Sequence, residues 1–305
     1  MSSLNSVATE VTPGLEPAWR VNLRELRLYL RRNPGLAIGL ALIATLLAFV
    51  IMGRFVVPWD SAFPMSGPAS SPPTAGYPFG TDLRGRDMLA VMVYGTLMTL
   101  KIGLLAGIVG VFFGASVAFV AAYHGGWIDV VLRVIVDVLI TVPSLLVLVV
   151  LASALQKSMT TTIMALTIAV LAWREPARKI RAQVLVMRES PYVSVARLNG
   201  ASSVRIIFLE MMPNLLPYLC ASLVMAIAWA VLASIGLEAL GLGSPAEPTL
   251  GMTIYWLMTD SAFMLGMWWW ILAPIVVLVI LFVGLYLVTA GLDELANPRL
   301  RARSS

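Results

Sequence analysis

The sequence predicts an all-α, polytopic membrane protein with six transmembrane helices. The first observation is composition: of 305 residues, 59% are apolar and 12% charged, and the mean hydropathy is +0.89. A soluble domain has about 45–50% apolar and about 25% charged residues, so this chain has too little polar surface to cover a globule in water. The second is a series of long stretches free of charge. The third is the clustering of basic residues between some of those stretches and not others.

The same composition excludes several other classes of protein. The charge is too low and the apolar share too high for a disordered chain or a coiled coil. The single cysteine, Cys220, has no partner for an internal disulfide, which excludes a secreted disulfide scaffold.

The N-terminal 33 residues are predicted to be a cytoplasmic tail with an amphipathic helix. About thirty polar residues precede the first apolar run, so this segment is not a cleavable signal. Arg20 to Arg32 alternates basic and apolar residues at roughly helical spacing. Two interpretations remain equally open: a helix lying on the inner leaflet, or a plain basic anchor.

Six apolar stretches approach the length of about 17–25 residues that a spanning helix needs. The first lies within a predicted helix at 34–57, and the sixth begins at the aromatic run from Trp268 to Trp270, which suits a membrane interface. The stretches are Gly35–Met52, Ile102–Tyr123, Val138–Gln156 (a helix starting near Val131), Ser158–Trp173, Met211–Leu237 and the part of Ser261–Leu292 that follows Trp268.

Between the first two spans lies a predicted extracytoplasmic loop and interfacial helix, residues 58–95. The loop is rich in Pro, Gly and Ser and ends in two acidic and two basic residues between Asp82 and Asp87. We expect a salt-bridged turn there, leading into a short interfacial helix that ends near Tyr94.

Basic residues predict the orientation. Fifteen of the 21 Lys and Arg residues lie in three segments: before the first span, between the fourth and fifth spans, and after the last. The positive-inside rule therefore places both termini, including a tail at 293–305, in the cytoplasm. An even number of crossings follows, which favours the short fourth span.

Within the spans, small and polar residues mark candidate structural or gating positions. Four glycines in the second span form small-xxx-small pairs that allow close helix packing, which we expect within the chain rather than in a dimer. They are Gly103, Gly107, Gly110 and Gly114. Arg133 and Asp137 lie four residues apart and are expected to pair, and Pro143 is expected to kink its helix.

Glu238, at the outer end of the fifth span, has two interpretations. It is a candidate contact for a cationic part of a cargo if it faces a water-filled path. Exposure to lipid headgroups is the favoured alternative.

The chain offers no site for catalysis or for a metal. One histidine, His124, and one cysteine are too few for a zinc, haem or Cys–His site. A phosphate-binding Gly-x-x-x-x-Gly-Lys-Ser/Thr loop is also missing from the sequence. We expect no enzyme activity and no bound cofactor, so energy for transport would come through a partner.

The loop at 174–213 has a pattern of its own. A basic helix is followed by a break at Ser190–Pro191, a two-turn helix, a stop at Gly200 and a second helix capped by Ser202 or Ser203. Tyr192, Val195 and Ala196 share one side of the short helix, which would suit docking in a partner's groove. An amphipathic surface loop is the alternative.

This loop resembles the coupling loop of binding-protein-dependent ABC importer permeases. The matching positions are Ala196, Gly200, Ala201, Ser202, Arg205, Ile206, Ile207, Pro213 and Asn214. Three further segments resemble the C-type subunit of the dipeptide/oligopeptide/nickel permease family. They are Gly80–Asp82 with Gly85–Asp87 and Tyr94–Gly95, Leu240–Gly243 with Pro248 and Gly251, and Asn297–Arg299.

The resemblance spans roughly residues 25–300 and implies a type I ABC importer permease fold, with a five-helix core at 96–292. It further implies a prokaryotic inner membrane location, a homologous second permease subunit, two ATPase subunits that bind ATP and Mg, and an extracytoplasmic solute-binding protein. No nucleic acid partner is implied. The residues implied in coupling to the ATPase are Tyr192, Ser194, Ala196, Arg197, Gly200, Ala201 and Ser202.

Four positions depart from the family pattern. Ser194 and Val195 stand where Glu and Ala are usual, Glu210 where His is common, and Glu238 where a small polar residue is usual.

The rival function is a secondary transporter or channel without an ATPase. Against it, neither an inverted repeat nor a chain of buried ionisable groups is detectable in the sequence. The sequence does not identify the cargo among peptides, nickel chelates, opines and sugars.

Overall fold

The computed structural model describes residues 28–296, a range built from helices and connecting turns without strands. Its helices are α2 (Pro34–Val56), α3 (Met88–His124), α4 (Gly126–Thr141), α5 (Ser144–Leu155), α6 (Thr161–Ala172), α7 (Arg174–Arg188), α8 (Pro191–Leu198), α9 (Ser203–Arg205), α10 (Met212–Ala239), α11 (Leu250–Thr259) and α12 (Trp268–Ala296). A π-helical stretch, Ile206–Met211, joins α9 to α10. The all-α prediction is confirmed, whereas the predicted amphipathic helix at 20–32 falls largely outside the described residues.

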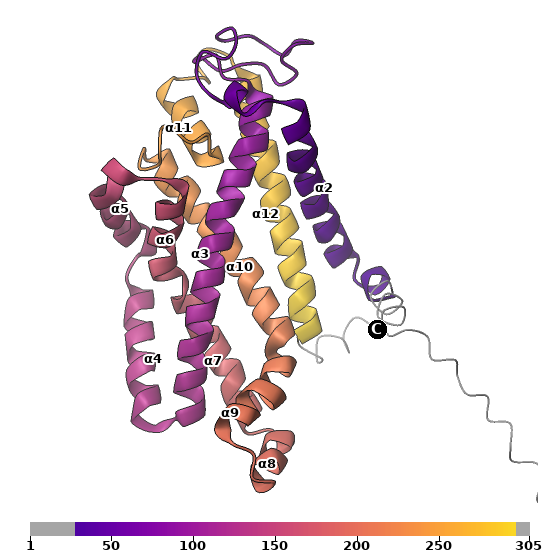
Figure 1. Ribbon diagram of the computed structural model, residues 1–305, viewed down its shortest axis with the longest axis vertical. Coiled ribbons are helices and arrows are strands. Elements are labelled where there is room, and N and C mark those ends of the chain that lie inside the picture. Colours follow the sequence, from indigo (N-terminus) through magenta and orange to yellow (C-terminus); the bar gives the residue numbers. More distant parts are fainter. Residues whose placement is uncertain (1–27, 297–305) are drawn as a thin grey trace, which may run out of the picture.

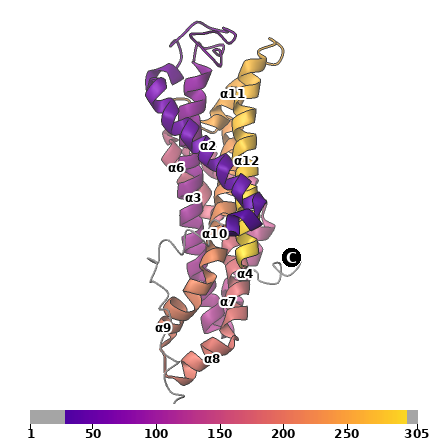
Figure 2. The ribbon, with the colours of Figure 1, turned by 90° about the vertical axis from the view of Figure 1, so that its right-hand side faces the viewer.

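The bundle is elongated, and α3 runs through its middle. Figure 1 shows α2, α3, α10 and α12 along the long axis, with the loop before α3 at one end and α8 at the other. The quarter-turned view in Figure 2 shows α2 crossing in front of α12. We call the end near α3's first residues the outer end and the end with α8 the inner end.

Helix α3 merges two elements that the sequence suggested were separate. Asp87 caps it, with the carboxylate accepting a hydrogen bond from the N–H of Leu89 at 2.9 Å, and the helix then continues unbroken to His124. The interfacial helix expected to end near Tyr94 is therefore the first turns of the second span. The reason is burial: residues 90–93 are fully buried in the core, so nothing ends the helix at the interface.

Four of the glycines of α3, those predicted to form close contacts, allow three other helices to approach its backbone. A Cβ on Gly103 would lie within 3 Å of Val231 of α10, and a Cβ on Gly107 within 3 Å of Ile227 of the same helix. At Gly110 it would lie 2.7 Å from the Cβ of Ala172 in α6, and at Gly114 2.6 Å from the carbonyl oxygen of Trp173, beside α7. The glycines thus pack within the chain, as expected from their spacing.

The span predicted around Pro143 is broken there. Helices α4 and α5 meet at an angle of 82°, because proline lacks the N–H that would continue the helix. The predicted kink at Pro143 is confirmed in a stronger form, as a complete break.

The count of six spans is not confirmed. Four helical segments are long and apolar enough to cross a membrane, or five if the bent α4–α5 pair is one span. The predicted fourth span falls short because a 3-10 turn at Gln156–Ser158 and the cap at Thr160 use its first residues, which leaves the 12-residue helix α6.

At the outer end, the predicted salt-bridged turn is present and buried. Nε of Arg86 donates to Asp82 at 2.5 Å, and the other carboxylate oxygen of Asp82 accepts from the backbone N–H groups of Arg84 and Arg86. Arg84 instead reaches Asp260 at 3.1 Å and stacks over the ring of Trp256. The turn thereby joins the start of α3 to the segment that follows α11.

We predict that Gly107→Leu destabilises the bundle, because a Cβ there would already lie 2.8 Å from Ile227 Cγ1. Overpacking of this kind costs about 1–3 kcal/mol. Thermal unfolding of the purified chain in detergent should show a lower midpoint. The neighbouring exposed Ile108 is the control, and Ile108→Leu should leave the midpoint unchanged. An unchanged midpoint for Gly107→Leu would contradict the close packing.

We also predict that Asp82→Asn costs about 3–5 kcal/mol, because it leaves the Arg86 guanidinium buried without its counter-charge. The partly exposed pair of Arg84 and Asp260 provides the comparison, and Arg84→Gln should cost less than about 1 kcal/mol. Equal losses in the two variants, measured by the same thermal unfolding, would show that burial does not distinguish the two pairs.

Candidate functional site

Residues 174–213 form the inner end of the molecule; we call them the coupling segment. Figure 1 shows α7 descending beside α3, with α8 and α9 below the rest of the bundle. Helix α7 turns Ala177, Ile180 and Val184 into the core, while most of its basic residues remain accessible. Within this segment, helix α8 is accessible and lies at the very end of the bundle.

The local structure of the coupling segment agrees with the sequence pattern. Ser190 precedes Pro191 at the first turn of α8, which suits proline because the first helical N–H groups have no partner in the helix. Gly200 ends the helix region with a φ of +74°, a conformation that favours glycine. The Ser202 hydroxyl then caps α9 by accepting from the N–H of Arg205 at 3.4 Å.

The faces of α8 differ in part from expectation. Val193 is fully buried against Ile206 and Met211, and Ala196, expected in a partner's groove, is half-buried on the same inner side. The accessible apolar surface instead includes Val195 and Leu198, which are 55% and 88% exposed. Leu198 was not among the predicted coupling residues, although its position three residues after Val195 places both on one helix face.

The remaining predicted coupling residues occupy the same tip. Tyr192, Ser194, Gly200 and Ser202 are accessible, and Ala201 is half-buried. Arg197 lies 5.8 Å from the centre of the Tyr123 ring at the end of α3, which ties α8 to the bundle by a cation–π contact.

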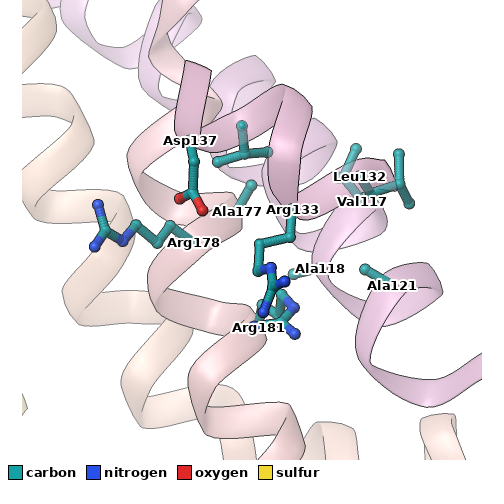
Figure 3. Close-up of a pocket in the computed structure, with 10 residues that line it drawn as sticks. Val117, Ala118, Ala121, Leu132, Arg133, Asp137, Ala177, Arg178 and Arg181 are labelled. Atoms are coloured by element: carbon teal, nitrogen blue, oxygen red, sulfur yellow. The ribbon is translucent and has the colours of Figure 1, made fainter. Parts of the chain in front are cut away.

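A cavity of about 230 Å³, lined by four charged and six apolar residues, lies between α3, α4 and α7. Figure 3 shows the Arg133 side chain extending beside Arg181, while the Asp137 carboxylate lies on the side of Arg178. The expected pair of Arg133 and Asp137 is wrong: Arg181 binds Asp129 through two hydrogen bonds of 2.5 and 2.6 Å instead. Spacing of four residues permitted the pair, but no ion pair joins Arg133 to Asp137 among the described residues, and the neighbouring Arg181 of α7 pairs with Asp129.

A second cavity, of about 330 Å³, lies between the α4–α5 break, α7 and α10, and includes the buried residue Arg174. The guanidinium donates to the carbonyl of Leu171 at 2.9 Å, to the hydroxyl of Ser144 at 2.7 Å and to the carbonyl of Leu139. Burial lowers the pKa of Arg174, while nearby Glu175 acts to raise it. In the sequence, Arg174 is only one of the basic residues between the predicted fourth and fifth spans, with nothing nearby that indicates these distant partners.

Glu238 is buried, so its expected exposure to lipid headgroups is wrong. Its residue surface is 2% exposed, and its Oε2 accepts no hydrogen bond from any described residue. The cause is the turn after α10, which begins at Gly241 with a φ of +80° and brings α11 back over the helix end. A Cβ on Gly251 would lie 2.2 Å from Oε2, so glycine is what allows this approach.

Within residues 28–296, no three or more His, Cys, Asp or Glu side chains are grouped to hold a metal ion.

Comparison with known proteins is consistent with this architecture. Residues 108–302 match the family model described as "Binding-protein-dependent transport system inner membrane component". A putative peptide transport system permease protein of Brucella abortus is 32% identical over 89% of this chain and 90% of its own length. The dipeptide transport system permease protein DppC of Haemophilus influenzae is 29% identical over 92% and 95%.

A solved structure, an inward-facing form of the MetNI methionine ABC transporter, shares the fold. It covers 67% of this chain and 97% of its own chain at a TM-score of 0.52 and 21% identity. The family match extends over more than half of the sequence. This chain belongs to the family of binding-protein-dependent transport system inner membrane components, and it is an integral inner membrane protein that serves as a permease of an ABC importer.

Proposed function

We propose that this chain is one of two related permease subunits that form a path for peptides or a related small solute. The names of the curated relatives, which are peptide and dipeptide permeases, support this class of cargo. An extracytoplasmic solute-binding protein delivers the cargo at the outer end, and both termini lie in the cytoplasm. Spans within residues 96–292 line the path.

The observation that carries this proposal is the accessible face of α8. An apolar, 88% exposed Leu198 at the tip of a short helix has the character of an anchor that a partner's groove covers. The partner is one of two cytoplasmic ATPase subunits, which bind ATP and Mg. Tyr192, Ser194 and Arg197 surround the anchor, while Ala196, Gly200, Ala201 and Ser202 shape and hold the helix.

The helices of the permease then move according to whether the ATPase has bound ATP. An ATPase that binds α8 differently with and without ATP shifts the permease between two arrangements of its helices. The absence of the usual acid at Ser194 leaves the docking contact to apolar groups, hydroxyl groups and the Arg197 cation. Glu238 remains the candidate cargo contact, reached only when α11 moves away from α10.

We predict that Leu198→Glu, alone or with Val195→Glu, abolishes recovery of the ATPase. A charge in the centre of an apolar contact should cost about 2 kcal/mol or more, which weakens binding about thirtyfold. The measurement is a mild-detergent pull-down of the tagged chain with mass spectrometry of the proteins that copurify. Recovery of a second permease and an ATPase with the wild-type chain is the expected result.

The matched control is Met65→Glu, which places the same charge on a residue 91% exposed in the outer loop. This variant should recover the ATPase as the wild type does. A wild-type chain that purifies without an ATPase and still transports solute would contradict the proposal and favour the secondary transporter.

A further inference from the structure

The break between α4 and α5 leaves backbone carbonyls that the helix itself does not satisfy. In a regular helix the Leu139 carbonyl would accept from the N–H of residue 143, but Pro143 has none. The Val138 carbonyl accepts from the Thr141 hydroxyl at 2.7 Å, and the Leu139 carbonyl accepts from Arg174. A side chain from a different helix therefore completes the broken end of α4.

Arg174 joins three chain segments at once. Beside the end of α4, it binds Ser144 at the start of α5 and the carbonyl of Leu171 near the end of α6. The residue is 4% exposed, so water does not compete freely for these bonds. Because the guanidinium is planar and its donors are fixed relative to one another, both sides of the break are held at a defined position relative to α7.

Arg174 is also the first residue of the coupling segment. Helix α7 begins at this residue and runs for 15 residues, about 22 Å, to the turn that leads into α8. Ile180 and Val184 pack with residues of α3, and Ala177 lies against Gly114 of α3, so α7 is a packed helix rather than a loose linker. Helix α7 therefore connects α8 directly to the point where Arg174 holds the break.

We propose that Arg174 is a positioning residue that transmits movement of the coupling segment to the α4–α5 break. The source of the movement rests on the proposed function, whereas the clamp is a property of this chain alone. As α7 shifts, the break opens or closes, because both of its sides are bonded to the same guanidinium. The 330 Å³ cavity changes shape with it, since Ser144 and Arg174 both line its wall.

The clamp is tested by amide hydrogen exchange of the full purified chain in detergent. Arg174→Met should speed exchange at residues 144–150 by about tenfold or more, because the start of α5 loses its tether and the Leu139 carbonyl its donor. Pro143→Ala supplies an N–H to that carbonyl, so the double variant Pro143→Ala/Arg174→Met should regain most of the protection. Arg54→Gln, which removes an exposed arginine at the outer end of α2, is the control and should change nothing.

Transmission is tested by the same measurement on the assembled importer with and without MgATP and vanadate. In the wild type the nucleotide should change exchange at both α8 and the break. In Arg174→Met it should change exchange at α8 but no longer at the break, and Arg174→Lys should be intermediate because an ammonium lacks the fixed fork.

The possible results distinguish three claims: the clamp by Arg174, the transmission of movement, and the proposed function. Unchanged exchange at the break in Arg174→Met would overturn the clamp. Faster exchange there with an intact nucleotide response would overturn transmission and leave Arg174 with a structural role only. A wild-type chain that assembles with no ATPase would overturn the proposed function and with it the transmission, while the exchange data on the isolated chain would still decide the clamp.

Discussion

Every backbone N–H and C=O inside a bilayer must find its partner within the protein, because the hydrocarbon offers none. This constraint explains why α3 continues without interruption from its Asp87 cap to His124, and why the sharp break at Pro143 needs hydrogen-bond donors from side chains. At Pro143 the helix loses a donor, and the Thr141 hydroxyl and the Arg174 guanidinium bind the exposed carbonyls. A buried cation is thus retained where an apolar residue would leave a backbone group unsatisfied.

Close packing around α3 is the second condition of the fold. Glycines on this helix let α6, α7 and α10 reach its backbone, so the helix that begins at the outer turn also supports the coupling segment. The two ends of the molecule differ in character. The outer end is fixed by the buried pair of Asp82 and Arg86, whereas the inner end presents Val195 and Leu198 without cover. The outer end is thus held by a buried ion pair, and the inner end offers an accessible apolar contact.

Much of the site was predictable because its signals are local. Proline at the start of α8, glycine at its end and serine at the next cap are properties of a few neighbouring residues, and each lies where the pattern indicated. The salt-bridged turn before α3 is local in the same way, since Asp82 and Arg86 are one turn apart. The family resemblance rested on these same motifs and was confirmed by comparison.

The sequence by itself determined the class, because hydropathy, basic clusters and caps act over a few residues. Only the tertiary structure decided which distant groups meet. It placed Asp129 with Arg181 instead of Arg133 with Asp137, buried Glu238 beneath α11, and brought Arg174 to a carbonyl 35 residues away. It also showed that the stretch before Trp173 yields a helix of only 12 residues. Such partners depend on how helices pack against each other, and spacing along one helix carries no information about the helix that faces it.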